Sequence, residues 1–201
     1  RLDGTTWKLG TTAANPSSIT VSTHLHGRKG ILKLPNGTSE IDQLSVDQMQ
    51  KNQYGTVKVE ESQGAIAYRI RFNPEQSGDS LPTEDDLQIP QEEIPGIQET
   101  LKILKIQGKP GPAFLNEVSA YFEKNFRYSL KRSHPNPSST PLSAFLLENR
   151  SGHCEYFATA TTLLLRGAGI PARYAVGYSV SEFSPLEKQY IVRSRHAHAW
   201  T

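Results

Sequence analysis

Residues 151–178 read SGHCEYFATATTLLLRGAGIPARYAVGY, and this stretch combines a helix, its two ends and a cysteine. Small and apolar residues recur at helical spacing and predict one buried helix face, made of Phe157, Ala160, Thr161, Leu164 and Ala168. Gly167 and Gly169 end this helix, and Pro171 prevents it from resuming. Residues 172–180, which read ARYAVGYSV, are then predicted to form a strand.

Cys154 is the only cysteine of the 201 residues, and it opens the predicted helix. A helix N-terminus carries unpaired N–H groups and a partial positive charge, so a thiolate is stabilised there. Gly152 allows a substrate to approach the backbone closely, and the N–H of Cys154 is free to donate to an oxyanion. The alternative is a thiol that only fills the core, because free cysteines are often buried.

The sequence RHAHAW at 195–200 places two histidines in a predicted strand over 189–200. Residues two apart on a strand share a face, so we expect His196 and His198 to point the same way. Their alanine neighbours leave room around an imidazole. A thiol at a helix start that faces a histidine on a strand is the arrangement of nucleophilic cysteine catalysis.

Together, the quoted stretch and AHAW resemble the transglutaminase-like superfamily of thiol enzymes. The shared motifs are the Gly-His-Cys turn, Leu-Arg-x-x-Gly-Ile-Pro-Ala-Arg, the Gly-Tyr strand end and Ala-His-Ala-Trp. The match is dense over 142–200, and a weaker match reaches back to Phe114 through FRYSL. More narrowly, the sequence resembles a bacterial branch whose core is displayed outside the cytoplasmic membrane after transmembrane helices. The resemblance implies an α+β, papain-like core with the cysteine helix packed on an antiparallel sheet.

Carried over residue by residue, the resemblance makes Cys154 the nucleophile and His198 the general base. It also implies an aspartate on the next strand that orients the imidazole, but no Asp or Asn follows Asn149 in the sequence. We therefore expect this aspartate beyond the given chain, which starts at Arg1 and is expected to be a fragment. The candidates for substrate binding or an oxyanion hole are Tyr128, Gly152, His153, His196 and Trp200.

The chain is predicted to divide into a β-rich region over 1–75, a linker over 76–96 and a transglutaminase-like core over 97–201. In the first region, 31–41 carries a hairpin turn at Asn36–Gly37, and 40–50 suggests a short helix. Helices are predicted at 97–108 and 111–126. The second of these carries an apolar stripe: Phe114, Val118, Tyr121, Phe122 and Phe126.

Composition limits the partners. The chain has 22 basic and 20 acidic residues, a net charge of +2 and no concentrated basic run, so nucleic-acid binding is not expected. No apolar run approaches the roughly 18 residues of a membrane span, and no signal peptide opens the chain. We expect an extracytoplasmic domain, from the resemblance alone, whose parent protein is anchored through segments outside this chain.

The predicted function is thiol-dependent acyl transfer on amide bonds of protein or peptide substrates, with water or a second amine substrate as acceptor. No cofactor and no metal are expected. A zinc site formed by Cys154, His153, His196 and His198 is one alternative, because these residue types suit zinc. The other is a catalytically silent binding module that keeps the fold.

Overall fold

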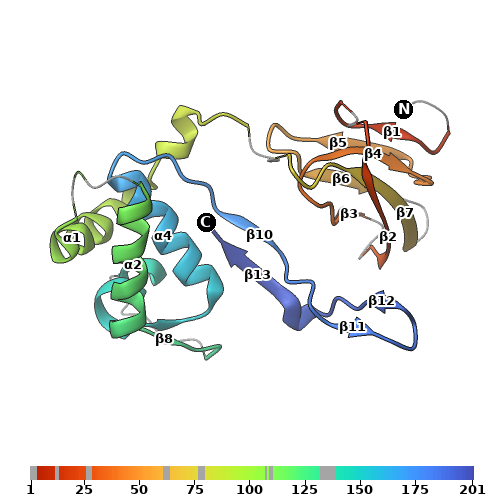
Figure 1. The fold of residues 1–201 in the computed structure, drawn as a ribbon. Helices are drawn as coiled ribbons and strands as arrows, with labels where there is room; N and C mark the ends of the chain where they lie inside the picture. The colour runs from red at the N-terminus through yellow and green to blue at the C-terminus, as the bar shows by residue number, and fades with distance from the viewer. Residues whose placement is uncertain are drawn as a thin grey trace. The chain divides into compact units, whose positions relative to one another are not determined.

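The computed structural model describes residues 4–11, 14–25, 29–60, 64–76, 80–106, 108, 111–131 and 139–201. The chain folds as two units, Arg1–Leu81 and Pro82–Thr201 (Figure 1). Each unit has its own cluster of buried apolar side chains. In its described part the first unit contains strands only, whereas the second combines helices with short strands.

Two antiparallel sheets make up the first unit, with strand orders β1-β4-β7-β2 and β3-β6-β5. Their strands are β1 (Trp7–Lys8), β2 (Ser17–His24), β3 (Lys29–Ile31), β4 (Thr38–Asp42), β5 (Gln48–Lys51), β6 (Val57–Glu60) and β7 (Ala65–Phe72). Alternation buries every second side chain, as for Val57 and Val59 on either side of exposed Lys58. The resulting core contains Leu25, Leu32, Ile41, Leu44, Val46, Val57, Val59, Ile66, Tyr68 and Ile70.

Two local predictions for this unit are wrong. A turn does form at Asn36–Gly37, where Gly37 has a φ of +74°, but β3 and β4 on its two sides belong to different sheets. The turn therefore connects the sheets instead of closing a hairpin. Residues 40–50 are not helical, because β4 buries Ile41 in the core and β5 begins at Gln48. Burial against neighbouring strands outweighs a weak helix propensity.

Tyr68 on β7 binds the connection between β3 and β4. Its hydroxyl accepts from the N–H of Lys33 at 3.0 Å and donates to the carbonyl of the same residue at 3.2 Å. Burial raises the pKa of Tyr68 to about 12.

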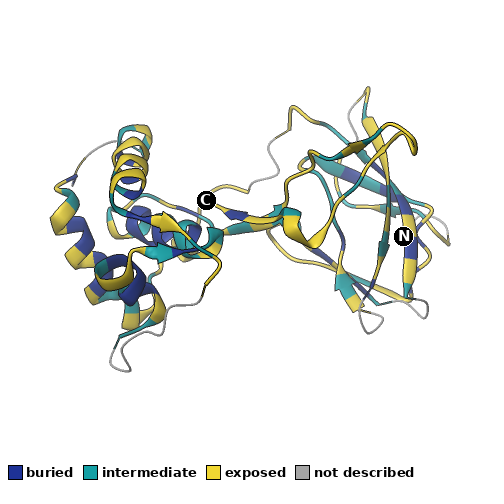
Figure 2. Cartoon of the chain, turned by 90° about the horizontal axis from the view of Figure 1, so that it is seen from below, coloured by how far each residue is buried: buried dark blue, intermediate teal, exposed yellow. Residues whose placement is uncertain are grey.

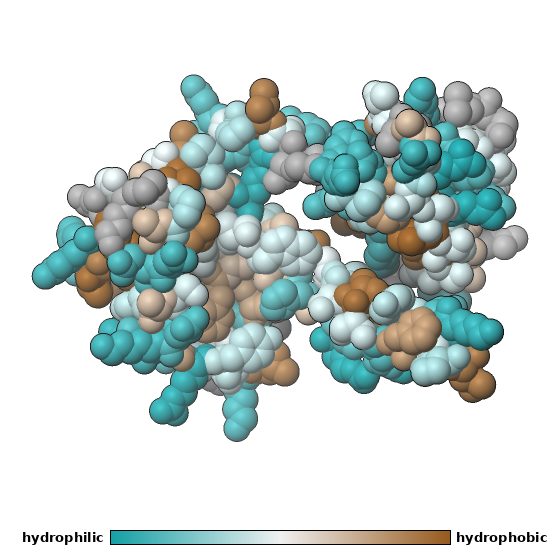
Figure 3. Space-filling view, in the orientation of Figure 1, coloured by the Kyte–Doolittle hydropathy of each residue, from teal (hydrophilic) through white to brown (hydrophobic). Residues whose placement is uncertain are grey.

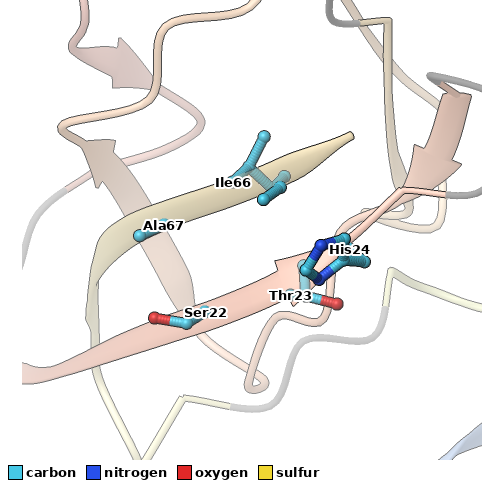
Figure 4. Close-up of a pocket in the computed structure, with 6 residues that line it drawn as sticks. Ser22, Thr23, His24, Ile66 and Ala67 are labelled. Carbon is cyan, nitrogen blue, oxygen red and sulfur yellow. The ribbon is translucent and has the colours of Figure 1, made fainter. Parts of the chain in front are cut away.

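A surface pocket of about 340 Å³ lies on β2 and β7 of the first unit (Figure 4). None of the candidate catalytic residues lines it. Its walls are the residue pairs at one end of the β2–β7 ladder: Ser22, Thr23, His24, Ala65, Ile66 and Ala67.

Helices dominate the second unit. They are α1 (Ile94–Leu104), α2 (Gly111–Asn125), α3 (Pro141–Ala144) and α4 (Cys154–Gly167), and a π-helical segment, η4 (Phe145–Asn149), continues α3. The helix predicted over 97–108 ends at Leu104, because Lys105 takes a left-handed conformation with a φ of 54°. None of the helices in the described ranges is long and apolar enough to cross a membrane.

The predicted apolar stripe of α2 lies in the core of the second unit, with Tyr121 partly buried at its edge. Figure 2 shows buried and exposed residues on different sides of the helices of this unit. On α4, burial extends beyond the predicted face, because α1, α2 and β13 (Ala197–Trp200) all contact this helix. Gly167 marks the close approach of α1. A Cβ there would lie 2.9 Å from Cγ2 of Ile97 and 3.0 Å from Cδ1 of Leu101.

Residues 83–93 form a strap that contains η2 (Glu84–Leu87) and η3 (Gln91–Glu93). Asp86 is 3% exposed, and its carboxylate accepts hydrogen bonds from Nε and Nη2 of Arg173 at 2.8 and 2.7 Å. Glu93 accepts from the hydroxyls of Thr140 and Ser143. The predicted linker over 76–96 is therefore wrong from residue 82 onward, because this part of the chain belongs to the second unit.

Short antiparallel strands end the described chain. β10 (Ala175–Tyr178) pairs with β13, and β11 (Phe183–Ser184) pairs with β12 (Gln189–Tyr190). The strand predicted over 189–200 is interrupted by a 3-10 turn, η5 (Ser194–His196). Apolar side chains are exposed around β11 and β12 (Figure 3).

Candidate active site

Cys154 is a half-buried free thiol at the first position of α4. His153 caps the helix with an extended backbone, and its carbonyl accepts from the N–H of Tyr156 at 3.0 Å. The first-turn N–H groups and the helix dipole therefore act at the thiol. This is the position that the sequence predicts for a nucleophile.

Gly152 and Tyr128 lie next to Cys154 because two short strands pair in parallel. β8 (Arg127–Tyr128) pairs with β9 (Ser151–Gly152), and Tyr128 is the partner of Gly152. The N–H of Ser129 donates to the carbonyl of Gly152 at 2.8 Å. Tyr128 is 61% exposed, and its ring stacks on Phe157 at 6.4 Å. The structure thus brings Tyr128, which lies far from Cys154 in sequence, to the turn that precedes the thiol.

Gly152 is required by packing in this turn. A Cβ at this position would lie 3.0 Å from the side chain of Tyr156. The ring of Tyr156 also meets the imidazole of His153 edge-on at 5.1 Å. Nδ1 of that imidazole lies 3.9 Å from a carboxylate oxygen of Glu155. His153 therefore lies at the edge of the site, held by its neighbours in sequence.

His198 and Trp200 lie on β13, which packs against α4. His198 pairs with Gly177, and a Cβ at Gly177 would lie 2.7 Å from the indole of Trp200. The rings of His198 and Trp200 stack at 6.5 Å with an interplanar angle of 21°. Trp200 therefore covers Gly177 and orients the imidazole from one side.

The two faces of β13 have different surroundings. Ala199 is buried, and Oγ1 of Thr201 donates to the carbonyl of Ala158 on α4 at 2.9 Å. Alternation places His198 and Trp200 on the other face of the strand. Among the described residues, no hydrogen bond joins the imidazole of His198 to the sulfur of Cys154. The structure brings the two elements together without joining these side chains.

His196 does not share the strand face of His198, contrary to the prediction. It lies in η5, where Nδ1 accepts from the N–H of Arg193 at 3.2 Å and Nε2 lies 3.5 Å from Glu182. Glu182 also binds the guanidinium groups of Arg193 and Arg195. These cations lower the pKa of Glu182, chiefly through the hydrogen bond from Arg193. His196 is thus part of an ion cluster at the end of β13 that lies away from Thr201.

The described residues offer no group of ligands for the zinc site that was considered as an alternative. Within the described ranges, no three His, Cys, Asp or Glu side chains are grouped so that they could hold a metal ion.

Two residues near the site were missed by the sequence prediction. Asp86 binds Arg173 across 87 positions, and its backbone carbonyl accepts from the N–H of Ala172 at 3.0 Å. Tyr174 follows at the start of β10, where burial and then the charges of Glu155 and Cys154 raise its pKa. The IPAR motif marks the location, but nothing in the strap sequence indicates the partner of Arg173.

Comparison with known proteins identifies the family of this unit. Residues 103–201 match the model of the transglutaminase-like superfamily. This part of the chain belongs to that superfamily.

Two curated relatives match short segments. A protein-glutamine gamma-glutamyltransferase of Pseudomonas aeruginosa is 40% identical over 75 residues, which cover 37% of this chain and 11% of that protein. The uncharacterized protein YebA of Bacillus subtilis is 40% identical over 60 residues, which cover 28% of this chain and 8% of that protein. The chain thus spans about a tenth of the length of these relatives.

A solved structure shares the fold. The periplasmic domain of TgpA from Pseudomonas aeruginosa has a TM-score of 0.70 and 22% identity, over 94% of this chain and 66% of that chain. The likeness confirms the predicted α+β fold of the transglutaminase-like type.

Proposed function

We propose that the second unit is a thiol-dependent acyl-transfer domain that acts on amide bonds, with Cys154 as its nucleophile. The observation that carries this proposal is the position of Cys154, a half-buried free thiol at the start of α4, beside the strand that bears His198. Superfamily membership of residues 103–201 supports the same chemistry.

In the proposed reaction, the thiolate of Cys154 attacks the carbonyl carbon of a carboxamide or peptide bond. The C–N bond breaks, the amine leaves with a proton from the imidazolium of His198, and a thioester remains. An amine or water then attacks the carbonyl carbon of the thioester and gives its proton to His198. The C–S bond breaks, and the thiolate of Cys154 and the imidazolium of His198 are restored. Unliganded enzymes often hold catalytic hydrogen bonds long or misaligned, so the missing Cys154–His198 bond is compatible with this pairing.

The remaining candidates have supporting roles in this proposal. Tyr128, beside Gly152, supplies a hydroxyl at the rim that can donate to an oxyanion. Trp200 and His153 shape the walls around the acyl group. His196 is the weakest candidate, because both of its ring nitrogens face partners in its own ion cluster.

The substrate class and location are part of the same proposal. The Pseudomonas relative is a protein-glutamine gamma-glutamyltransferase, which supports a protein substrate with carboxamide groups. The TgpA structure is of a periplasmic domain, which supports an extracytoplasmic domain of a membrane-anchored parent protein.

The test is an assay with a glutamine-containing peptide and a fluorescent primary amine. Amine incorporation indicates a transferase, and ammonia or peptide release without incorporation indicates a hydrolase. Cys154→Ala is the matched control and should abolish both. A wild-type protein that binds the peptide but shows neither product would overturn the proposal in favour of a binding module. The same assay on a chain continued in its natural sequence tests dependence on the aspartate that the resemblance implies.

A further inference from the structure

Tyr174 points toward the helix that carries Cys154. In the β10–β13 ladder Ala175 pairs with Trp200, so Tyr174 is level with Thr201. Residues that face each other in an antiparallel pair project their side chains to the same side of the sheet. The side chain of Thr201 reaches α4, where its hydroxyl donates to Ala158 and meets the hydroxyl of Thr162 at 3.0 Å. The side chain of Tyr174 therefore projects to the α4 side as well.

The part of α4 that this side chain faces includes the thiol. Ala158 is the fourth residue after Cys154, and residues four apart lie one above the other on a helix. Cys154 is thus one turn from the carbonyl that binds Thr201, at the open end of the helix. A tyrosine side chain is long enough to bridge one helical turn.

Tyr174 has a fixed backbone. Arg173, directly before it, is bound by Asp86, and the N–H of Ala172 donates to the carbonyl of Asp86 at 3.0 Å. Nε of Arg166 on α4 donates to the carbonyl of Ala172 at 2.9 Å. The start of β10 is therefore attached to both the strap and α4, and Tyr174 enters the site from a rigid segment.

The phenol remains a hydrogen-bond donor in this position. Burial of its ring, then the charge of Glu155 and then that of Cys154 raise the pKa of Tyr174, which keeps the hydroxyl protonated. Within the described chain, this hydroxyl has no hydrogen-bond partner. The carboxylate of Glu155 lies instead 3.9 Å from Nδ1 of His153.

We propose that the hydroxyl of Tyr174 donates a hydrogen bond to the thiolate of Cys154 and so stabilises the nucleophile. The inference rests on the proposed function in taking Cys154 as the reactive group. It assigns Tyr174 to the reaction centre, in addition to the residues that the motifs indicate.

Other groups also act on this thiol and must be kept constant in a test. His153 and Glu155 belong to the start of the same helix, Tyr128 comes from β8, and His198 comes from β13. Tyr174→Phe changes none of them and removes one oxygen atom. Tyr178→Phe is the matched control, because Tyr178 lies on the same face of β10 and is equally exposed, at 40%.

The experiment measures the rate of alkylation by iodoacetamide against pH, in the 201-residue protein. Cys154 is the only cysteine, so all labelling reports on it, and Cys154→Ala gives the blank. We expect Tyr174→Phe to move the midpoint upward by roughly half to one pH unit, because a hydrogen bond to an anion is lost. Tyr178→Phe should keep the wild-type midpoint. Tyr174→Gln retains a hydrogen-bond donor, so its midpoint should lie between those of the wild type and Tyr174→Phe.

An unchanged midpoint in folded Tyr174→Phe would overturn the inference, and so would an equal shift in Tyr178→Phe. Circular dichroism verifies the fold of each variant, and Tyr174→Gln gives a second comparison if Tyr174→Phe does not fold. Turnover is measured separately. A shifted midpoint with no turnover, even in a chain continued in its natural sequence, would reject the proposed function and leave the role of Tyr174 intact. Turnover by the wild type, together with an unchanged midpoint in Tyr174→Phe, would support the proposed function and reject the role of Tyr174.

Discussion

His196 and His198 are two residues apart in the sequence, but their side chains have different neighbours. His196 is held by Glu182 and the backbone of Arg193 within a turn. His198 lies on β13, which contacts α4 through its opposite face, and one side of its ring stacks on Trp200. An imidazole that must accept and return a proton needs a nitrogen without a permanent partner, and His198 meets this condition among the described residues.

The two histidines therefore give opposite predictions. His198→Gln should lower kcat/KM for the glutamine peptide by about 10²- to 10⁴-fold, the range of a lost general base. His196→Gln should change it less than about tenfold, since this residue stabilises a surface ion cluster. Steady-state kinetics of both variants decides between them. An inactive His196 variant beside an active His198 variant would reverse the assignment.

Among the elements, the strap determines how α4 and β10 are held. Asp86 is buried, and its carboxylate binds Arg173 through two hydrogen bonds and the N–H of Thr83 through a third. These contacts, with the bond from Arg173 first, hold the pKa of Asp86 well below its usual range. The strap thereby stabilises the end of α4 and the segment that carries Tyr174.

Asp86 gives the second unit a dependence on acid. Because the folded pKa is lowered, the stabilisation is present above the unfolded pKa of about 3.9 and is lost as pH falls toward the folded value. Asp86→Asn should unfold at a temperature lower by roughly 10 °C at neutral pH, with less further loss below pH 4. Asp85→Asn, an exposed neighbour, is the control and should behave like the wild type. Thermal unfolding from pH 2 to 7 tests this prediction. An equal decrease in unfolding temperature below pH 4 in all three proteins would contradict it.

Packing of α1 on α4 gives a second prediction at this scale. Gly167→Ala should cost about 1 kcal/mol or more in unfolding free energy, because the new Cβ would crowd the buried side chains of Ile97 and Leu101 where α1 meets the end of α4. Gly111→Ala, at the start of α2, places its Cβ 4.0 Å from Ile170 and should be close to neutral. Urea unfolding of the two variants measures the difference, and a stabilised Gly167 variant would refute it.

Local sequence patterns predicted the helices better than the contacts between residues that are far apart in the sequence. The helix over 154–167 and the apolar stripe of α2 follow from spacing, because helix periodicity is contained in neighbouring residues. The position of Cys154 at the helix start follows from the residues around it, whereas the spacing of Tyr128 gave no evidence that it would lie near Cys154. The pair Asp86–Arg173 could not be predicted, because 87 positions separate two residues that pair only after folding. The turn at His196 was missed for a similar reason, since Glu182 reaches it from another strand segment.

In the molecule as a whole, two cores fold from separate lengths of chain, and each unit carries one tryptophan. Trp7 donates from its indole to the carbonyl of Leu44 in the first unit, and Trp200 belongs to the second. Trp7→Phe and Trp200→Phe therefore leave one fluorescent reporter in each unit. Their unfolding curves can be compared at any pH.

Alkali should weaken the first unit through Tyr68. The pKa of Tyr68 is raised to about 12, so its contribution is complete below the unfolded pKa of about 10 and is lost as pH rises through 12. The loss should reach roughly 2–3 kcal/mol in the signal from Trp7. In Tyr68→Phe this alkaline loss should disappear, at a cost of about 1–2 kcal/mol at pH 7 from the lost bonds to Lys33. An alkaline transition that the Trp200 reporter detects first would contradict the assignment.

The strap also decides where this chain can be divided. The family match begins at residue 103, but the carboxylate that binds Arg173 belongs to Asp86, 17 residues earlier, in η2. A polypeptide excised at residue 103 would keep a guanidinium that is mostly enclosed, without its counter-ion, and would lose α1 up to Lys102. A polypeptide excised at Pro82 retains both. The shortest autonomous form of this domain should therefore start before Thr83, and limited proteolysis of the intact protein should leave that start uncut.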